Sequence, residues 1–148
     1  TDGRGGGRMI STRGRYALRV LTDLAAHPGV YTPMREVAAR QEISLKYIEK
    51  ILPSLVSGGF VEGVHGKGGG YRLARDPSAI TVYDVLLLAE GDLAPVTCLS
   101  REAPPCPRAA YCKTLPMWKK YAQMTKEYFE SITVSDLVNT ESAGDFVI

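Results

Sequence analysis

The spacing of apolar positions predicts that the chain begins with short helices. Apolar side chains recur at helical intervals over residues 16–24, and His-Pro-Gly at 27–29 ends that helix. A second helix is expected over residues 33–41. Thr32 is a good N-cap for it, and Pro33 suits its first position because the N–H that proline lacks would be unpaired there.

A third helix is expected over residues 44–58, after a tight turn at Glu42 and Ile43 and with Ser44 as its cap. Pro53 is expected to bend or end its first part. Its predicted apolar face is Leu45, Ile48, Leu52, Leu55 and Val56, and its predicted exposed face is Lys46, Tyr47, Glu49, Lys50 and Ser54. Helix, short turn and helix together are typical of a DNA-reading helix-turn-helix.

Two strand-like segments, 60–64 and 71–74, flank the glycine-rich loop 65–70 and predict a hairpin. Next to a helix-turn-helix, such a hairpin would be a wing. The loop does not end in Lys-Ser/Thr and leads into a strand, so it is not expected to cradle a nucleotide. Charged side chains and glycines in and beside it could approach phosphate or the minor groove, namely His65, Lys67, Gly68, Gly69 and Arg72.

The exposed face of the third helix has the chemistry for reading DNA. Lys46 and Lys50 can meet phosphates or guanine acceptors, and Tyr47 can donate to a phosphate. Glu49 can accept a hydrogen bond from the cytosine amino group, or it can be a helical partner for a lysine. The complete set expected at DNA is Arg13, Ser44, Lys46, Tyr47, Glu49, Lys50, His65, Lys67, Gly68, Gly69 and Arg72.

The second half of the chain predicts two further helices. Thr81 and Asp84 resemble a capping box that opens a helix over 82–89, which Gly91 ends. A long helix follows, and its stripe consists of Trp118, Tyr121, Ala122, Thr125, Tyr128, Phe129 and Ile132. We expect this stripe to be a homodimer seam, which would present two reading heads to a symmetric operator; the alternative is that it covers its own domain.

Charge separates the two halves. Residues 1–75 hold 12 Lys/Arg and 6 Asp/Glu, whereas residues 76–148 hold 6 and 10, which gives +6 and −4. This asymmetry favours a nucleic-acid face on the first half, although a solvated surface could also produce it. The sequence has no membrane-spanning run and no signal-peptide core, and its three cysteines do not suggest a disulfide framework, so a reducing cytoplasm is expected.

The three cysteines, Cys98, Cys106 and Cys112, have the spacing C-x7-C-x5-C in a proline-rich loop. Three thiolates from one loop can converge on one metal centre, and soft sulfur ligands favour an iron–sulfur cluster or zinc. The spacing does not choose between these two, and ordinary free thiols are the third alternative. Nearby Arg101, Arg108 and Lys113 would help to keep the thiols deprotonated.

These residues resemble the Rrf-type winged-helix transcriptional regulators, particularly their iron–sulfur-sensing branch. The resemblance covers residues 9–138, and the segments that carry it are 11–17, 43–49, 68–71 and the cysteine triad. It implies a dimer whose cysteines hold a [2Fe-2S] cluster, with cluster occupancy deciding which promoters, typically those for cluster assembly, are bound. It also implies that Glu49 discriminates between bases.

The chain departs from the family pattern at the fourth ligand. Leu115 stands where a histidine follows the third cysteine in that branch, and Arg15 stands where the nitric-oxide-sensing branch has an aspartate. Seven residues, not five, separate the first two cysteines. A carboxylate, His27, His65, a partner-subunit residue or a small ligand remains open as the fourth ligand. The cysteine-metabolism repressors of the same family lack the triad, which counts against that branch.

The expected fold is mainly α with a small β-hairpin: a winged helix-turn-helix domain at 9–90, a cysteine-rich loop at 91–113, and a long C-terminal dimerisation helix with its end segment at 114–138. Residues 1–8 are expected to be a disordered leader or an expression remnant, and residues 139–148 a flexible tail. An electron carrier would explain the cysteines but leave the helix-turn-helix and wing unused; a winged protein-binding module with a structural zinc is a further alternative. No nucleophile–base motif appears, so an enzyme is not expected.

Overall fold

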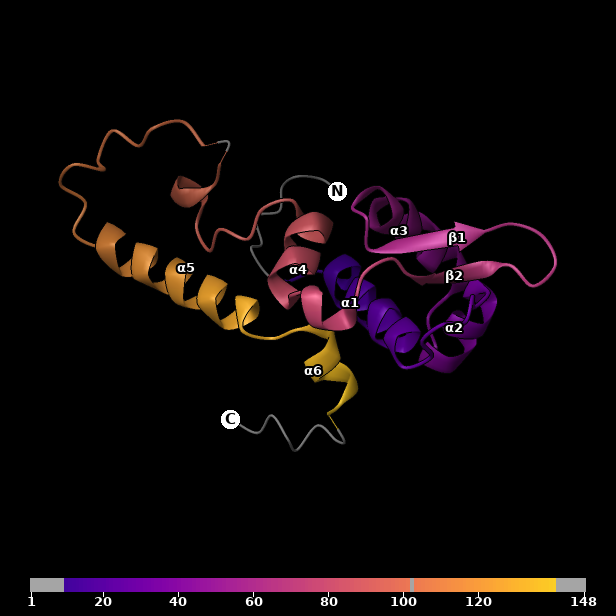
Figure 1. Cartoon of the computed structure of the whole chain (residues 1–148). Helices are drawn as coiled ribbons and strands as arrows, with labels where there is room; N and C mark the ends of the chain where they lie inside the picture. Colours follow the sequence, from indigo (N-terminus) through magenta and orange to yellow (C-terminus); the bar gives the residue numbers. More distant parts are fainter. Residues whose placement is uncertain (1–9, 102, 141–148) are drawn as a thin grey trace.

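The computed structural model describes residues 10–101 and 103–140; the expected leader and residues 141–148 of the expected tail lie outside the described residues. The described chain is mainly helical with one hairpin (Figure 1). Its helices are α1 (Thr12–Ala25), α2 (Met34–Gln41), α3 (Leu45–Ser57), α4 (Val82–Glu90), α5 (Leu115–Glu130) and α6 (Val134–Val138); its strands are β1 (Val61–Val64) and β2 (Gly70–Leu73). Short 3-10 turns occur at Pro77–Ala79 and Thr97–Leu99.

Helices α1 to α4, helix α6 and the hairpin pack together, and we refer to them as the head. Helix α1 lies at its centre and contacts α2, α3, α4, α6 and β2. Val20 and Leu21 of α1, Ile48 of α3 and Val85 of α4 have essentially no exposed surface. Their burial removes enough apolar surface to hold five short elements around one helix. The predicted winged helix-turn-helix architecture is confirmed.

The start of α2 differs from the prediction. Pro33, not Thr32, is the N-cap residue, and it makes no side-chain cap. Thr32 is buried and exchanges two backbone hydrogen bonds of 2.8 Å with Tyr71. A β-carbon on Gly70 would lie 2.4 Å from the Thr32 carbonyl carbon, so only glycine permits this joint between the wing and α2.

Helix α3 begins as predicted, because the Ser44 hydroxyl accepts a hydrogen bond from the Tyr47 N–H at 3.0 Å. The helix does not end before Pro53 but continues to Ser57. Its predicted apolar face is also partly wrong: Leu45 and Val56 are 38% and 44% exposed, while Ile51 is buried in their place. The buried face of α3 is therefore shifted around the helix toward Ile51 relative to the face that the periodicity suggested.

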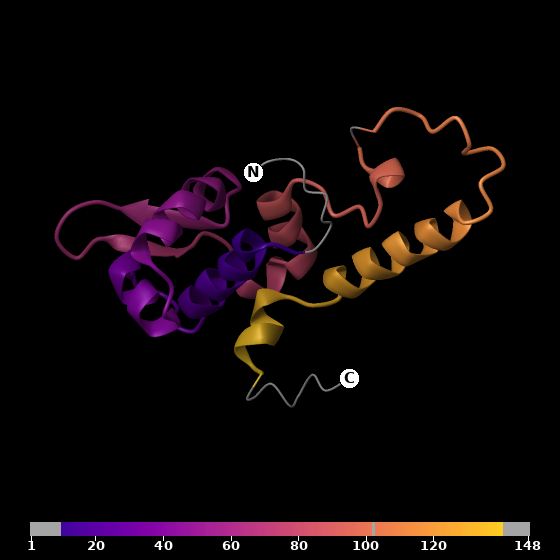
Figure 2. The same cartoon turned by 180° about the vertical axis from the view of Figure 1, so that it is seen from behind.

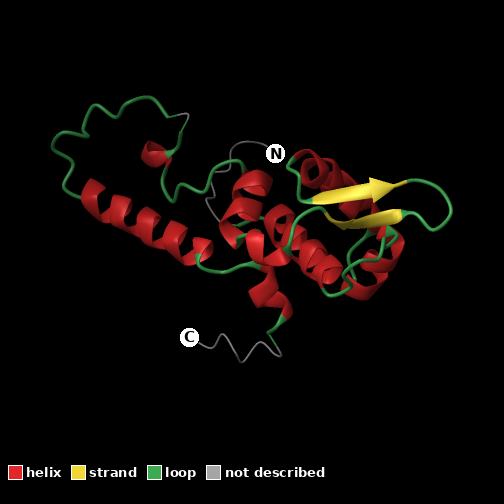
Figure 3. Ribbon diagram, in the orientation of Figure 1, coloured by secondary structure: helices red, strands yellow, loops and turns green. Residues whose placement is uncertain are grey.

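The predicted hairpin is present. Strands β1 and β2 pair antiparallel, with Val61 opposite Leu73 and Val64 opposite Gly70. The loop between them extends from the head, on the side away from α5 (Figure 3). The wing and the recognition helix α3 therefore belong to one end of the molecule.

The predicted α4 is confirmed: the Thr81 hydroxyl caps the Asp84 N–H at 3.1 Å, and Gly91 ends the helix with a φ of 82°. Residues 91–101 and 103–114 then belong to a long connection that contains the 3-10 turn at Thr97–Leu99, and α5 projects from the head in both views (Figures 1 and 2).

The expected placement of Ile132 on the long helix is wrong. Helix α5 ends at Glu130, and the Ile132 carbonyl accepts a hydrogen bond from the Val82 N–H at 2.8 Å. Thr133 and Asp136 then form a capping box that starts α6, and this local signal outweighs continuation of the stripe. Val134 is fully buried in the head, so the chain returns to the core after α5.

Candidate nucleic-acid interface and cysteine loop

Helix α3 presents Lys46, Glu49 and Lys50 as exposed side chains. Among the described residues, the Glu49 carboxylate forms no ion pair, so a helical lysine partner does not account for it. An unpaired carboxylate on a basic face is repelled by phosphate and is useful mainly where it can accept from a base amino group. Ser44 is committed to the helix cap through its side chain.

Tyr47 does not lie on the open face with the lysines. Its ring is half-buried and packs edge-on against Tyr16, with the ring centroids 5.2 Å apart. Its phenol oxygen lies 2.9 Å from the Thr12 hydroxyl. The side chain that was expected to meet phosphate thus links α3 to the first turn of α1.

A hollow of about 390 Å³ brings Arg13 of α1 and Lys50 of α3 to one surface. Arg13 donates from Nη1 to the Ala89 carbonyl at 3.3 Å, which places its guanidinium at the C-terminal end of α4. Tyr47 and Ser54 also line the hollow. The two cations and the Ser54 hydroxyl around this concavity are suited to a phosphate oxygen, whereas the Tyr47 hydroxyl is already paired with Thr12.

Glu90 fixes the N-terminus of α1, a role the sequence did not reveal. Its Oε2 atom accepts from the Ser11 N–H at 3.0 Å, the Ser11 hydroxyl at 2.8 Å and the Gly14 N–H at 3.1 Å. A carboxylate in this position satisfies unpaired helix donors and favours the positive end of the helix dipole. The first turn of α1, which carries Arg13, is thereby tied to the residue before the cysteine-rich loop.

The wing offers His65 and Lys67 as exposed side chains. Arg72 is more constrained than expected: its Nε donates to the Glu62 carboxylate at 2.8 Å, and its guanidinium lies 4.4 Å from the centre of the Tyr31 ring. The hydrogen bond to Glu62 raises the pKa of Arg72. Because Glu62 offsets the charge of Arg72, His65 and Lys67 are the side chains of the wing that are more available to contact DNA.

A buried carboxylate sets the position of α2 against α1. Asp23 is 5% exposed and accepts two hydrogen bonds from Arg40, at 2.7 and 3.1 Å, and one from Gln41 at 3.0 Å. Burial acts to raise the pKa of Asp23, but the hydrogen bonds and the charge of Arg40 outweigh it, so the pKa is lowered. This joint ties the last turn of α2 to α1.

The three cysteines lie along the connection between α4 and α5. Cys98 and Cys106 are exposed and Cys112 is partly exposed. Within residues 10–101 and 103–140, no three potential ligands among Cys, His, Asp and Glu gather at one point. The loop therefore does not hold the thiols in a preformed site.

Cys112 is the thiol most clearly prepared for ligation. Its sulfur lies 3.5 Å from the Thr114 hydroxyl, directly before the start of α5. Hydrogen bonding to the side chain and backbone of Thr114, with smaller contributions from Leu115 and Arg108, lowers the pKa of Cys112. A thiol at a helix N-terminus is readily deprotonated, which suits a metal ligand.

The donor set fits an iron–sulfur cluster in chemistry, with three thiols available in one loop. A fourth ligand is not supplied by Leu115, and the two histidines lie on the head. His27 contacts the Asp23 carbonyl at 2.9 Å, and His65 belongs to the wing.

The predicted stripe of α5 divides into two faces. Trp118, Ala122, Thr125 and Phe129 are half-buried. The neighbouring face, about 100° around the helix, is open, and its apolar residues are Met117, Tyr121, Met124 and Tyr128, exposed by 54%, 52%, 56% and 56%. Met117 and Met124 were missed, although they follow the same spacing of three and four.

Comparison with known proteins gives a consistent result. The family model Rrf2, described as an iron-dependent transcriptional regulator, matches residues 10–140. Protein rrf2 of Nitratidesulfovibrio vulgaris is 38% identical over 135 residues, which cover 90% of this chain and 89% of the relative. No helix in the described part of the chain is long and apolar enough to cross a membrane.

Two solved structures are similar over most of their length. CymR, the global cysteine regulator of B. subtilis, has a TM-score of 0.73 and 32% identity, with 88% of this chain and 95% of that chain covered. IscR of T. potens has a TM-score of 0.72 and 28% identity, with 99% and 96% covered.

Proposed function

This chain belongs to the Rrf2 family of transcriptional regulators, and on that premise we propose that it binds a double-stranded operator as a homodimer under the control of a [2Fe-2S] cluster held by Cys98, Cys106 and Cys112. Its relatives are DNA-binding regulators of transcription and not enzymes. By analogy with the IscR relatives, the proposed targets are genes for iron–sulfur cluster assembly, and the proposed location is the cytoplasm.

The observation that carries the cluster proposal is the loop itself: three thiols, each at least partly exposed, lie between the head and α5. Free cysteines are usually buried as small apolar side chains, so three accessible ones in a single connection favour ligation. When bound, the cluster would supply a redox- and oxygen-sensitive cross-link between the segments that carry the thiols.

The open face of α5 supports a homodimer. Met117, Tyr121, Met124 and Tyr128 form a continuous apolar stripe of the kind that soluble proteins seldom leave exposed. Two antiparallel copies of α5 would cover both stripes and place the heads at opposite ends, as a palindromic operator requires. Half-sites one helical turn apart would separate the heads by about 34 Å.

Control of DNA binding follows from where the loop is attached. Its first residue, Gly91, directly follows Glu90, which holds the N-terminus of α1, and its last residues lead into α5. Ordering of the loop would fix the path between the head and α5, and hence the separation of the two heads. With the two heads at one separation, Arg13, Lys46 and Lys50 of both heads would contact phosphates of the operator. At the other separation they would not reach these phosphates.

The decisive experiment is absorption spectroscopy with iron and sulfide analysis of protein purified without oxygen. We expect visible absorption with two irons and two sulfides per chain, lost in Cys106→Ala and kept in Ala109→Ser, a matched variant at an exposed position of the same loop. Stoichiometric zinc without colour would replace the cluster by a zinc site. Absence of both metals after attempted reconstitution would contradict the proposal and favour control by thiol chemistry.

DNA binding tests the regulatory half of the proposal. Protein with and without its cluster should differ at least tenfold in affinity for one or more promoter fragments, with the salt concentration held fixed. Equal affinity of both forms for every fragment would contradict cluster control while leaving the DNA-binding function intact.

A further inference from the structure

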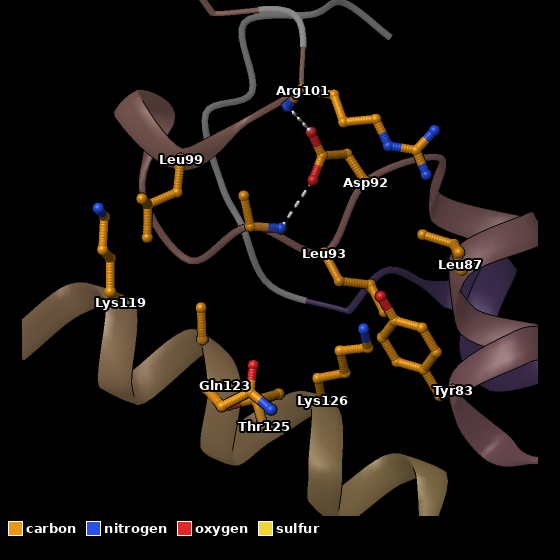
Figure 4. A pocket seen from close by; sticks show the side chains of 12 residues that line it. Tyr83, Leu87, Asp92, Leu93, Leu99, Arg101, Lys119, Gln123, Thr125 and Lys126 are labelled. Carbon is orange, nitrogen blue, oxygen red and sulfur yellow. Dashed lines mark hydrogen bonds between the residues drawn. The ribbon is translucent and has the colours of Figure 1, made fainter. Parts of the chain in front are cut away.

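A second cavity lies between the head and α5, away from the recognition helix. It has a volume of about 410 Å³ and is bordered by α4, the first part of the cysteine-rich loop and α5 (Figure 4). Leu87, Leu93, Leu99 and Ala122 give it apolar walls. This size and lining are those of a site for a small organic molecule.

The charged groups of the cavity are mostly cationic. Lys119, Lys126 and Arg101 line it from α5 and the loop. Neither Lys119 nor Lys126 makes an ion pair within the described ranges of the chain. Lys126 lies 5.7 Å from the centre of the Tyr83 ring, which places its ammonium group beside α4.

The carboxylate in the lining, Asp92, is already used to shape the loop. Its Oδ1 accepts from the Ala94 N–H at 2.8 Å, and its Oδ2 accepts from the Ser100 hydroxyl at 2.7 Å and the Arg101 N–H at 3.0 Å. Figure 4 shows Asp92 within this turn, above the opening that faces α5. With Asp92 bonded within the loop, three of the four charged side chains in the lining are cationic, which favours an anion.

The two lysines of the cavity lie away from the proposed dimer seam. At 100° per residue, Lys119 and Lys126 lie on the side of α5 opposite to Tyr121 and Met124, and Ala122 and Thr125 of the lining lie between these two sides. A partner helix seated on the exposed stripe would leave the side that carries the lysines uncovered.

We propose that this cavity binds a small organic anion, a carboxylate on an apolar body, with the anionic group at Lys119 and Lys126 and the body against Leu93 and Leu99. A ligand here would contact the residue after Cys98 and would join the loop to α5. The protein would thus have an effector site separate from its cysteine triad. The proposal requires neither DNA nor a cluster, so its failure is distinct from failure of the proposed function.

The test uses two fluorescent dyes with the full chain. 8-Anilinonaphthalene-1-sulfonate carries an anionic group, and N-phenyl-1-naphthylamine has the same apolar body without it. We expect the sulfonate to bind at least tenfold more tightly than the neutral dye. Phenylacetate should displace the sulfonate, and phenylacetamide should not.

Variants locate the dye. Lys119→Met and Lys126→Met should each raise its dissociation constant on the order of threefold, and the double variant about tenfold, as expected for partly exposed charge pairs. Lys120→Met, which is outside the lining, and Met124→Ser, on the exposed stripe, should leave binding unchanged.

Three results would overturn the proposal: equal binding of both dyes, unchanged sulfonate binding in the folded double lysine variant, or loss of binding in Met124→Ser. If the lysine variants fail to fold, the comparison of phenylacetate with phenylacetamide on the unaltered protein still decides whether the site requires an anion.

Discussion

The Thr12 hydroxyl and the Tyr47 phenol oxygen lie 2.9 Å apart, so the first turn of α1 is hydrogen-bonded to the recognition helix. Tyr47 also packs against Tyr16, which lies about one turn after Thr12 in α1. The residue that the sequence suggested as a phosphate donor is therefore a link between the element that Glu90 anchors and the element that reads DNA.

This link predicts a non-additive pair of substitutions. Thr12→Val and Tyr47→Phe each remove the hydrogen bond and keep the packing, so each should weaken operator binding about three- to fivefold, as expected for one neutral hydrogen bond. The double variant should be no weaker than either single one. Additive losses, with Tyr47→Phe weakening all operator sequences alike, would instead indicate a direct contact of the Tyr47 hydroxyl with phosphate.

The Glu90 contact predicts a measurable loss of stability. Glu90→Ala leaves the Ser11 and Gly14 N–H groups without their acceptor and should lower the free energy of unfolding by about 1–2 kcal/mol. Glu90→Gln keeps an acceptor oxygen but not the charge, and should lose roughly half as much. Denaturant unfolding measures both.

Glu130→Ala is the matched control, because Glu130 is an exposed glutamate at the end of the other helix that borders the cysteine-rich loop. Its effect should stay within about 0.5 kcal/mol. A loss in Glu130→Ala equal to that in Glu90→Ala would contradict a specific capping role.

The local signals in the sequence were sufficient for the helix-turn-helix, the wing and α4. Ser44, Thr81 and Gly91 mark helix ends through their own side-chain or backbone properties, which act within three residues. The same reasoning failed at Thr32 because its backbone pairs with Tyr71, 39 positions later in the sequence. A long-range partner outweighed the local cap preference.

The functional surface was less accessible to prediction for the same reason. Lys46, Glu49 and Lys50 are exposed as helical periodicity requires. The contacts of Glu90 with Ser11 and of Arg72 with Tyr31 join segments far apart in the sequence, and no spacing rule indicates them. The sequence did predict an apolar stripe on α5. The stripe that is exposed, however, consists of Met117 and Met124 together with Tyr121 and Tyr128, and the two methionines were not included in the prediction.

Asp23 predicts how stability depends on pH. Its pKa is lowered in the folded protein, so its contribution to stability is present above the unfolded pKa of about 4 and is lost as pH falls through the folded value. Asp23→Asn should lower the free energy of unfolding at pH 7 by about 2 kcal/mol, because hydrogen bonds to a charged group are lost. It should also flatten the decline in stability below about pH 4.

Urea unfolding at pH 3 to 7 tests this expectation, with Asp76→Asn as the control. Asp76 also has a lowered pKa, but it is exposed and bonded only locally to Ser78. If the free energy of unfolding of Asp23→Asn fell at low pH as steeply as that of the unaltered protein, other carboxylates would be responsible for the loss of stability in acid.

The last prediction separates base reading from phosphate binding on α3. Glu49 is exposed and forms no ion pair within the described residues, whereas Lys50 lines the hollow with Arg13. Glu49→Ala should therefore relax discrimination at one base pair, by about 1–3 kcal/mol between the preferred and altered operators. Lys50→Ala should weaken all operators alike and reduce the salt slope by about 1. Fluorescence anisotropy with a panel of single-base operator variants at several salt concentrations measures both effects. If the two substitutions produced the same pattern across the panel, the division of roles between Glu49 and Lys50 would be wrong.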